Sequence, residues 1–139
     1  MSEREILFRG KDLQEQNDWL YGYFYKSDIN KRERESGKAT LIFTPNCDTF
    51  IYVPEYHNSW MVKPETVGQY TGLTDKNGTR IFEGDIVKVA DEYIDYAIWA
   101  NGCFCMARQM MFYEFTYQDS NRMEVIGNIH DNPELLKGD

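Results

Sequence analysis

The pattern of apolar and polar positions along the 139 residues predicts short strands rather than helices. Apolar and aromatic residues come in short runs that are bounded by Gly, Pro, Asn and Asp, as is typical of antiparallel strands. No long window has a convincing helical period, although part of 106–115 comes close. The pattern therefore predicts a mainly β protein. The expected strands are 5–9, 19–25, 40–44, 49–53, 67–73, 81–82, 86–90, 95–100, 103–107, 110–117 and 124–129.

Turn residues predict how several of these strands pair. The runs 5–9 and 19–25 are expected to form an N-terminal antiparallel hairpin. Asn77-Gly78 is the strongest turn signal, because Asn-Gly supplies the positive φ angles that a tight hairpin turn requires. A second pair, Asn101-Gly102, predicts another hairpin.

Further glycines and polar residues mark changes in chain direction. Gly68 and Gly72 weaken a flat strand and indicate a bulge or a close contact. At Gly84-Asp85, glycine tolerates a positive φ and the aspartate can cap the backbone amides after it. Asn132 is expected to cap a single helical turn that begins at Pro133.

Two segments show no strand pattern. Residues 26–38 mix both charge signs without an apolar period, which predicts a mobile surface loop. Residues 55–63 form a connector that carries His57 and Trp60. The chain length fits one domain, residues 1–139, with an N-terminal β segment at 1–63, a central part at 64–130 and a tail at 131–139.

Composition supports sheet and limits the partners. Ten Tyr, eight Phe and three Trp give an aromatic apolar content that suits half-buried pleated surfaces. The net charge of −8 repels phosphate backbones and anionic lipid, so bulk electrostatics argue against tight binding to nucleic acid or membranes. No signal peptide or membrane-spanning run is visible, and three cysteines follow no disulfide spacing. We therefore expect a reduced, cytoplasmic protein.

Residues that could perform chemistry do not form a known motif. Only two histidines, His57 and His130, could activate a nucleophile, and neither lies in a nucleophile motif. Cys103 and Cys105 are expected to share one strand face. With Cys47 and one histidine they could bind zinc, but the usual paired spacing is missing and buried packing explains them equally well.

Acidic residues offer a further alternative. A carboxylate pair for hydrolysis could be drawn from the acids of the turn and the following loop, although solvated or capping roles are more usual for such spacing. We expect no cofactor, no metal site and no enzymatic activity, with a metal-dependent enzyme kept as an alternative. The acids concerned are Glu83, Asp85, Asp91, Glu92 and Asp95.

Two features could contact a partner. Alternate aromatics at Trp19, Tyr21 and Tyr23 can pack into a core or present rings for stacking. A basic run follows, although acids are interleaved with it; its cations are Lys31, Arg32 and Arg34.

Three blocks of the sequence, in order, resemble the YopX-like family, which occurs mainly in bacteriophages, prophages and related mobile elements. These are Arg4–Lys11 followed by Trp19–Gly22, then Pro64–Val87, and finally Glu124–Leu136. The resemblance implies an SH3-like barrel or roll in the central part and a tendency to self-associate. It implies no activity and no catalytic residues.

These observations predict a non-enzymatic protein-binding or self-assembly module. Its partner would be a second copy or a phage or host protein. A nucleic-acid-binding β-barrel that uses the basic run and the aromatic strand is the alternative, and its binding would fall steeply with salt.

Overall fold

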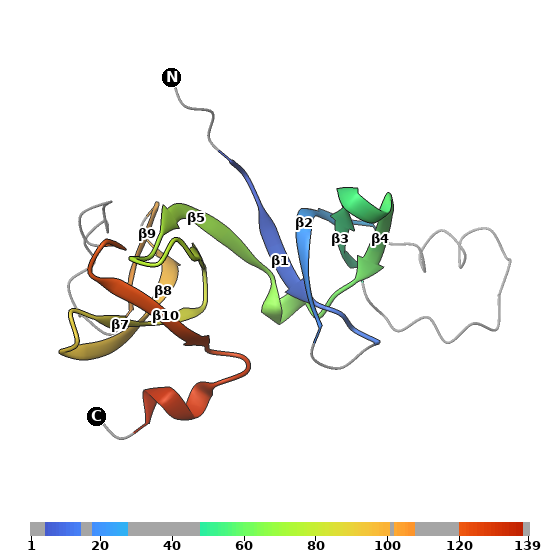
Figure 1. Ribbon diagram of the computed structural model, residues 1–139. Coiled ribbons are helices and arrows are strands. Elements are labelled where there is room, and N and C mark those ends of the chain that lie inside the picture. The colour runs from blue at the N-terminus through green and yellow to red at the C-terminus, as the bar shows by residue number, and fades with distance from the viewer. Residues whose placement is uncertain (1–4, 15–17, 28–47, 101, 108–119, 138–139) are drawn as a thin grey trace, which may run out of the picture. The chain divides into compact units, whose positions relative to one another are not determined.

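The computed structural model describes residues 5–14, 18–27, 48–100, 102–107 and 120–137 (Figure 1). The expected strands at 40–44 and 110–117 lie outside these residues, as does most of the expected loop at 26–38. The chain divides into two compact units, and we describe each by itself. The N-terminal unit is Leu7–Val67, and the C-terminal unit combines Met1–Ile6 with Gly68–Asp139.

The predicted mainly β class is confirmed, because both units are built from antiparallel strands. In the N-terminal unit the strands follow the order β4-β3-β2-β1. The predicted N-terminal hairpin is present, with Arg9 of β1 paired to Tyr21 of β2. The elements are β1 Phe8–Lys11, β2 Trp19–Lys26, β3 Thr49–Val53, η1 Pro54–Tyr56, β4 Asn58–Met61 and η2 Pro64–Thr66.

Strand β4 lies in the segment that we expected to be a connector. It pairs with β3, where Trp60 lies opposite Ile51. The sequence Asn-Ser-Trp-Met has no clear alternation, so the pairing with β3 decides its conformation rather than its local preference.

Within the N-terminal unit, strands β1 and β4 approach each other at their C-terminal ends. Just beyond β1 and β4, Asp12 forms an antiparallel bridge with Val62. The Lys63 amide donates to the Lys11 carbonyl at 2.9 Å, and the Leu13 amide donates to the Met61 carbonyl at 2.9 Å. The result is a roll rather than a closed barrel. Its inner face carries an apolar cluster of Ile51, Val53 and Val62, against which Phe8, Leu20, Phe24, Trp60 and Val67 pack.

The C-terminal unit contains a hairpin and a four-stranded sheet. The hairpin is β5–β6, and the sheet has the order β10-β7-β8-β9. Its core draws on β6 to β10: Ile81, Val87, Val89, Ala97, Phe104, Met106 and Met123. The elements are β5 Gly68–Thr74, β6 Arg80–Phe82, β7 Asp85–Val89, β8 Tyr93–Ala100, β9 Cys103–Met106, β10 Met123–Asn128 and η3 Pro133–Leu136. The described strands form no closed barrel here either.

The turn at Asn77-Gly78 differs in type from the expected one. Gly78 has φ +83°, but Asn77 is not among the described residues with positive φ. Thr74 pairs with Arg80, so the turn is wider than a two-residue connection. The side chain of Asp75 holds it, since Oδ1 accepts from the amides of Asn77 at 2.8 Å and Thr79 at 2.9 Å.

The predicted hairpin at Asn101-Gly102 is confirmed by its strand pairing. Ala100 at the end of β8 pairs with Cys103 at the start of β9, which leaves a two-residue connection. Gly102 has φ +80°, a conformation that glycine adopts without steric cost.

The two residues predicted as caps make contacts that the sequence did not predict. Asp85 Oδ2 accepts from the amide of Phe82, three residues earlier, at 2.7 Å. Asn132 occupies the cap position of η3 but makes no side-chain cap bond there. Its Oδ1 accepts instead from the Asn128 amide at 3.2 Å, so the side chain ties the end of β10 to the turn.

The two glycines of β5 behave as expected. A side chain at Gly68 would meet the Glu83 carbonyl at 2.7 Å, which confirms a close contact. Gly72 has φ +91° and lies where the β5–β6 register shifts, so the strand is irregular at this glycine.

Candidate functional site: a tyrosine face on the N-terminal unit

A row of exposed tyrosines runs along β2. Tyr21, Tyr23 and Tyr25 are 46%, 55% and 40% exposed. They occupy alternate positions of the strand and therefore point to the same side, away from the inner residues Leu20 and Phe24. Successive rings leave the strand roughly 7 Å apart, which is twice the rise per residue.

Neighbouring strands supply further rings to this side of the sheet. Tyr52 of β3 pairs with Tyr23, and Phe50 pairs with Tyr25. The Phe50 and Tyr25 rings are stacked, with centroids 5.2 Å apart and an interplanar angle of 11°. Because Phe50 is only 6% exposed, it gives Tyr25 a fixed apolar support. We call this surface the tyrosine face: Trp19, Tyr21, Tyr23, Tyr25, Phe50 and Tyr52.

Trp19, which the sequence places with the exposed aromatics, is half-buried. The Arg9 guanidinium lies 4.6 Å from the centroid of its ring, and Lys11 Nζ lies 5.7 Å away. Both cations are themselves buried, at 5% and 8% exposure. These contacts are cation–π interactions, which fix the indole ring at one end of the row.

The register places no carboxylate on this face of the described strands. Arg9 and Lys11 lie opposite Tyr21 and Trp19, and on β4 the corresponding positions are Ser59 and Met61. The N-terminal unit as a whole has eight Lys and Arg against nine Asp and Glu, whereas the rest of the chain has seven against fourteen. The negative charge is therefore concentrated in the C-terminal unit.

Of the predicted contact residues, Tyr21 and Tyr23 are thus brought together on an exposed face. Tyr25 and Tyr52 belong to the same face although the sequence argument did not select them. The alternation along 19–25 contained the signal for Tyr25, while Tyr52 needed the pairing of β2 with β3. The basic residues Lys31, Arg32 and Arg34 lie outside the described residues.

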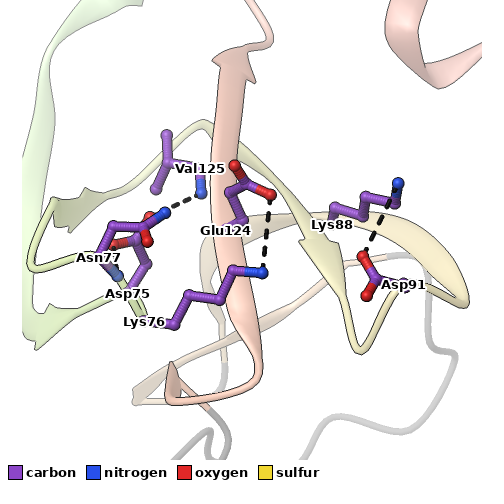
Figure 2. A network of polar contacts seen from close by, with 7 residues as sticks. All are labelled: Asp75, Lys76, Asn77, Lys88, Asp91, Glu124 and Val125. Carbon is purple, nitrogen blue, oxygen red and sulfur yellow. Dashed lines mark hydrogen bonds and ion pairs between the residues drawn. The ribbon is translucent and has the colours of Figure 1, made fainter.

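The Asp75–Gly78 turn, the strongest turn signal in the sequence, has a structural role. Besides its two contacts in the turn, Asp75 accepts from the Val125 amide of β10 through Oδ2, at 2.9 Å. The Lys76 amide donates to the Met123 carbonyl at 3.0 Å, and Lys76 Nζ lies 3.9 Å from Glu124 (Figure 2). This network joins the β5–β6 hairpin to β10.

The two described cysteines are poor candidates for reactive groups. Cys105 is fully buried, and Cys103 is half-buried with its thiol 3.6 Å from the Ala100 carbonyl. Burial, followed by the nearby Cys103 and Asp95, raises the pKa of the Cys105 thiol, so its thiolate is disfavoured. Cys47 lies outside the described residues. Within the part of the chain that is described, no three His, Cys, Asp or Glu side chains gather as metal ligands would.

The acids considered for hydrolysis make local structural contacts. Glu83 Oε1 accepts from the Gln69 amide at 3.2 Å, and Asp95 Oδ1 accepts from the Tyr96 amide at 2.8 Å. Asp91 forms an exposed ion pair with Lys88, at 3.8 Å (Figure 2). Asp85 accepts from the Phe82 amide, as described above. Each of these four acids thus has a contact that explains it without catalysis.

These features define a small, mainly β protein in two units, with an exposed row of tyrosines as its most distinctive surface. The model of the YopX protein family matches residues 7–137, nearly the whole chain, and the protein belongs to this family. A comparison with curated proteins gave no match. Among the described residues no helix is long and apolar enough to cross a membrane.

A solved structure shares the fold. Protein EF1440 from Enterococcus faecalis is 24% identical, with a TM-score of 0.54 over 97% of this chain and 100% of its own. At this level of identity the likeness extends to the fold alone.

Proposed function

We propose that this protein is a non-enzymatic binding module whose tyrosine face contacts another polypeptide chain. The partner is a second copy of the chain or a different protein of a mobile element or its host. The observation that supports the proposal is the row formed by Tyr21, Tyr23 and Tyr25, each of them 40% exposed or more.

Tyrosine rows suit protein contacts for physical reasons. A tyrosine offers a large apolar ring and a polar tip, and it loses little conformational entropy when it becomes ordered. Aromatic residues are enriched in interfaces while aspartate and glutamate are depleted, and the tyrosine face has this composition. The acidic C-terminal unit would repel a second copy, whereas the nearly neutral N-terminal unit would not.

The test compares two exposed tyrosines. Tyr23→Ala removes a ring from the face, and Tyr56→Ala removes a ring from η1 that is 68% exposed and lies outside the face. We expect Tyr23→Ala to lower the solution mass measured by light scattering, or to abolish capture of a partner seen with the wild type. Tyr56→Ala should behave as the wild type.

A strict monomer that captures the same proteins in wild-type and Tyr23→Ala form would refute this proposal. Circular dichroism of both variants controls for folding.

Single-stranded nucleic acid is a second candidate partner, favoured by the lack of acidic positions on the face. Charge reversal at Lys31, Arg32 and Arg34 should then abolish binding of a labelled oligonucleotide, and rising salt should weaken binding steeply. If binding of the oligonucleotide changes neither with salt nor with these substitutions, nucleic acid is ruled out as the partner of this face. A polypeptide remains the better partner, because Arg9 and Lys11 are buried against Trp19 and are poorly placed to meet phosphates.

A further inference from the structure

We propose that Asn77 is a site of spontaneous deamidation and that the turn around Asp75 controls the rate of its reaction. The reacting group is the side-chain amide of Asn77, and water is the other reactant. This site lies in the C-terminal unit and is independent of the tyrosine face and its partner.

The reaction joins Asn77 to the residue that follows it. The Gly78 backbone nitrogen loses its proton to hydroxide and forms a bond to Cγ of Asn77, and the side-chain nitrogen of Asn77 leaves as ammonia. The cyclic succinimide that results is opened by water, which attacks one of its two carbonyl groups. The product is aspartate, or isoaspartate when the backbone comes to run through the former side chain. Overall, water is consumed and ammonia is released.

The reacting atoms are open to solvent. Asn77 and Gly78 are both exposed, and a Cβ built on Gly78 would meet no heavy atom within 4 Å. Glycine has no Cβ beside the attacking nitrogen, so it is the least hindered residue for this attack. Hydroxide and water can therefore reach the site, and the chemistry is limited by the backbone conformation of the turn.

The closed turn opposes the first step of the reaction. The Gly78 amide donates to the Asp75 carbonyl at 3.0 Å, which retains the proton and directs the nitrogen toward Asp75. Oδ1 of Asp75 accepts from the Asn77 amide at 2.8 Å and from the Thr79 amide at 2.9 Å. These three hydrogen bonds fix the backbone on both sides of Asn77. The Gly78 nitrogen must be released from them before it can turn toward Cγ of Asn77.

Deamidation therefore proceeds through an opened turn. Asp75 is only 4% exposed, and its Oδ2 also accepts from the Val125 amide of β10, at 2.9 Å. Opening thus requires the buried carboxylate to give up contacts with two segments of the chain. When opening and closing are fast relative to the chemistry, the rate is proportional to the fraction of molecules that are open.

Both products would loosen the turn. An aspartate at position 77 adds a negative charge next to an amide that the Asp75 carboxylate accepts, and like charges repel. Isoaspartate adds a carbon atom to the backbone before Gly78, so Oδ1 of Asp75 cannot bridge the amides of residues 77 and 79 in the present geometry. Because the same carboxylate binds Val125, the modification weakens the attachment of the β5–β6 hairpin to β10 (Figure 2).

The experiment incubates the full-length protein in mildly alkaline buffer, with and without urea. Peptide mapping by liquid chromatography and mass spectrometry separates aspartate from isoaspartate, and it distinguishes Asn77 from the second Asn-Gly pair at Asn101. We expect Asn77 to react at least about tenfold more slowly in buffer than in urea, since opening the turn breaks several hydrogen bonds.

Two variants identify the contribution of the turn. Asp75→Ala removes the side-chain acceptor and should speed deamidation in buffer by about tenfold. Asp91→Ala removes an exposed carboxylate that pairs with Lys88 outside this network, so its rate should equal that of the wild type. In urea all three proteins should react alike, because the turn is absent there. Circular dichroism controls for folding.

The outcomes are decisive for each step. If Asn77 stays intact in urea, it is not a deamidation site. Equal rates in buffer and urea would show that the closed turn gives no protection, a result that holds even if Asp75→Ala does not fold. A difference between Asp75→Ala and the wild type in urea would assign the effect to local chemistry instead of the turn.

Hydrogen exchange tests the consequence of the modification. The Val125 amide should exchange faster in the deamidated chain than in the unmodified chain, because its acceptor is loosened. Unchanged protection of Val125 would contradict the proposed link between the modification and β10.

Discussion

At the scale of single residues, Gly22 makes the tyrosine row compatible with a curled sheet. It lies between Tyr21 and Tyr23 on the inner side of β2, where a Cβ would collide with the Tyr52 carbonyl of β3. A strand with a side chain at this point could not lie so close to β3. Glycine is therefore required here by close packing of the backbone.

Replacing Gly22 by alanine should destabilise the protein by about 2–3 kcal/mol, because the added methyl group meets backbone that cannot rotate away. Gly72→Ala is the matched control, since nothing lies within 4 Å of its Cβ and only its φ of +91° opposes a side chain. The control should lose about 1 kcal/mol. Urea denaturation of both variants measures the difference, and equal losses would contradict the packing argument.

Asp75 is the second residue on which local structure depends, since its two oxygens accept three backbone amides. In Asp75→Asn one acceptor becomes an amide donor that faces a backbone N–H, so we expect a loss of about 1–3 kcal/mol. Asp91→Asn alters an exposed ion pair and should cost well under 1 kcal/mol. Thermal unfolding of the two variants measures the loss of stability. If Asp75→Asn loses no more stability than Asp91→Asn, the hydrogen bonds of the turn contribute little.

At the scale of elements, the β5–β6 hairpin is anchored by an aromatic and charged cluster. Tyr70 of β5 packs against Phe82 of β6, with ring centroids 5.6 Å apart. Arg80 lies over the Tyr70 ring at 5.7 Å and forms an ion pair with Glu5 at 2.9 Å. The N-terminal residue Glu5 thus contributes to a cluster built on the central hairpin.

This cluster predicts a pH dependence. Burial, reinforced by the Glu5 carboxylate and partly offset by Arg80, raises the pKa of Tyr70 above its ordinary value of 10.0. The unfolded chain therefore loses this proton first, so the stabilisation is complete below pH 10 and declines as pH rises through the raised pKa of the folded protein.

The measurement is the free energy of unfolding between pH 9 and 11.5 for the wild type and Tyr70→Phe. The variant lacks the titrating hydroxyl, so its stability should fall less steeply over this range. Parallel curves would show that Tyr70 titrates alike in both states.

At the scale of the whole molecule, each unit has a core of its own. Ile51 belongs to the core of the N-terminal unit and Ile81 to that of the C-terminal unit, and both are fully buried. The family match spans both units, from residue 7 to 137. The two cores share no side chain, yet both lie within the part of the chain that matches the family.

The same substitution in each core tests their independence. Ile51→Val and Ile81→Val should each cost about 0.5–1.5 kcal/mol. By native-state hydrogen exchange, we expect Ile51→Val to speed exchange mainly within Leu7–Val67, and Ile81→Val mainly within Gly68–Lys137. Uniform acceleration over the whole chain by either variant would show a single cooperative unit instead.

Much of the fold could be predicted from the sequence because its signals are local. Period-two alternation and Gly-containing turns predicted most described strands to within a few residues, including the β8–β9 hairpin. Strand β4 was missed, because its polar start offers no alternation and its conformation depends on pairing with β3. The bond from Asp85 back to Phe82 was missed because a capping residue has more than one amide in reach.

The tyrosine row shows the same difference between local signals and the pairing of distant strands. The sequence by itself determined that aromatics alternate along residues 19–25, since a strand sends every second side chain to one side. Only the tertiary structure decided which side is exposed. The curled sheet encloses Leu20 and Phe24, two cations cover Trp19, and β3 adds Tyr52 to the row. Alternation is a property of the local backbone, whereas burial depends on which distant strands pair with it.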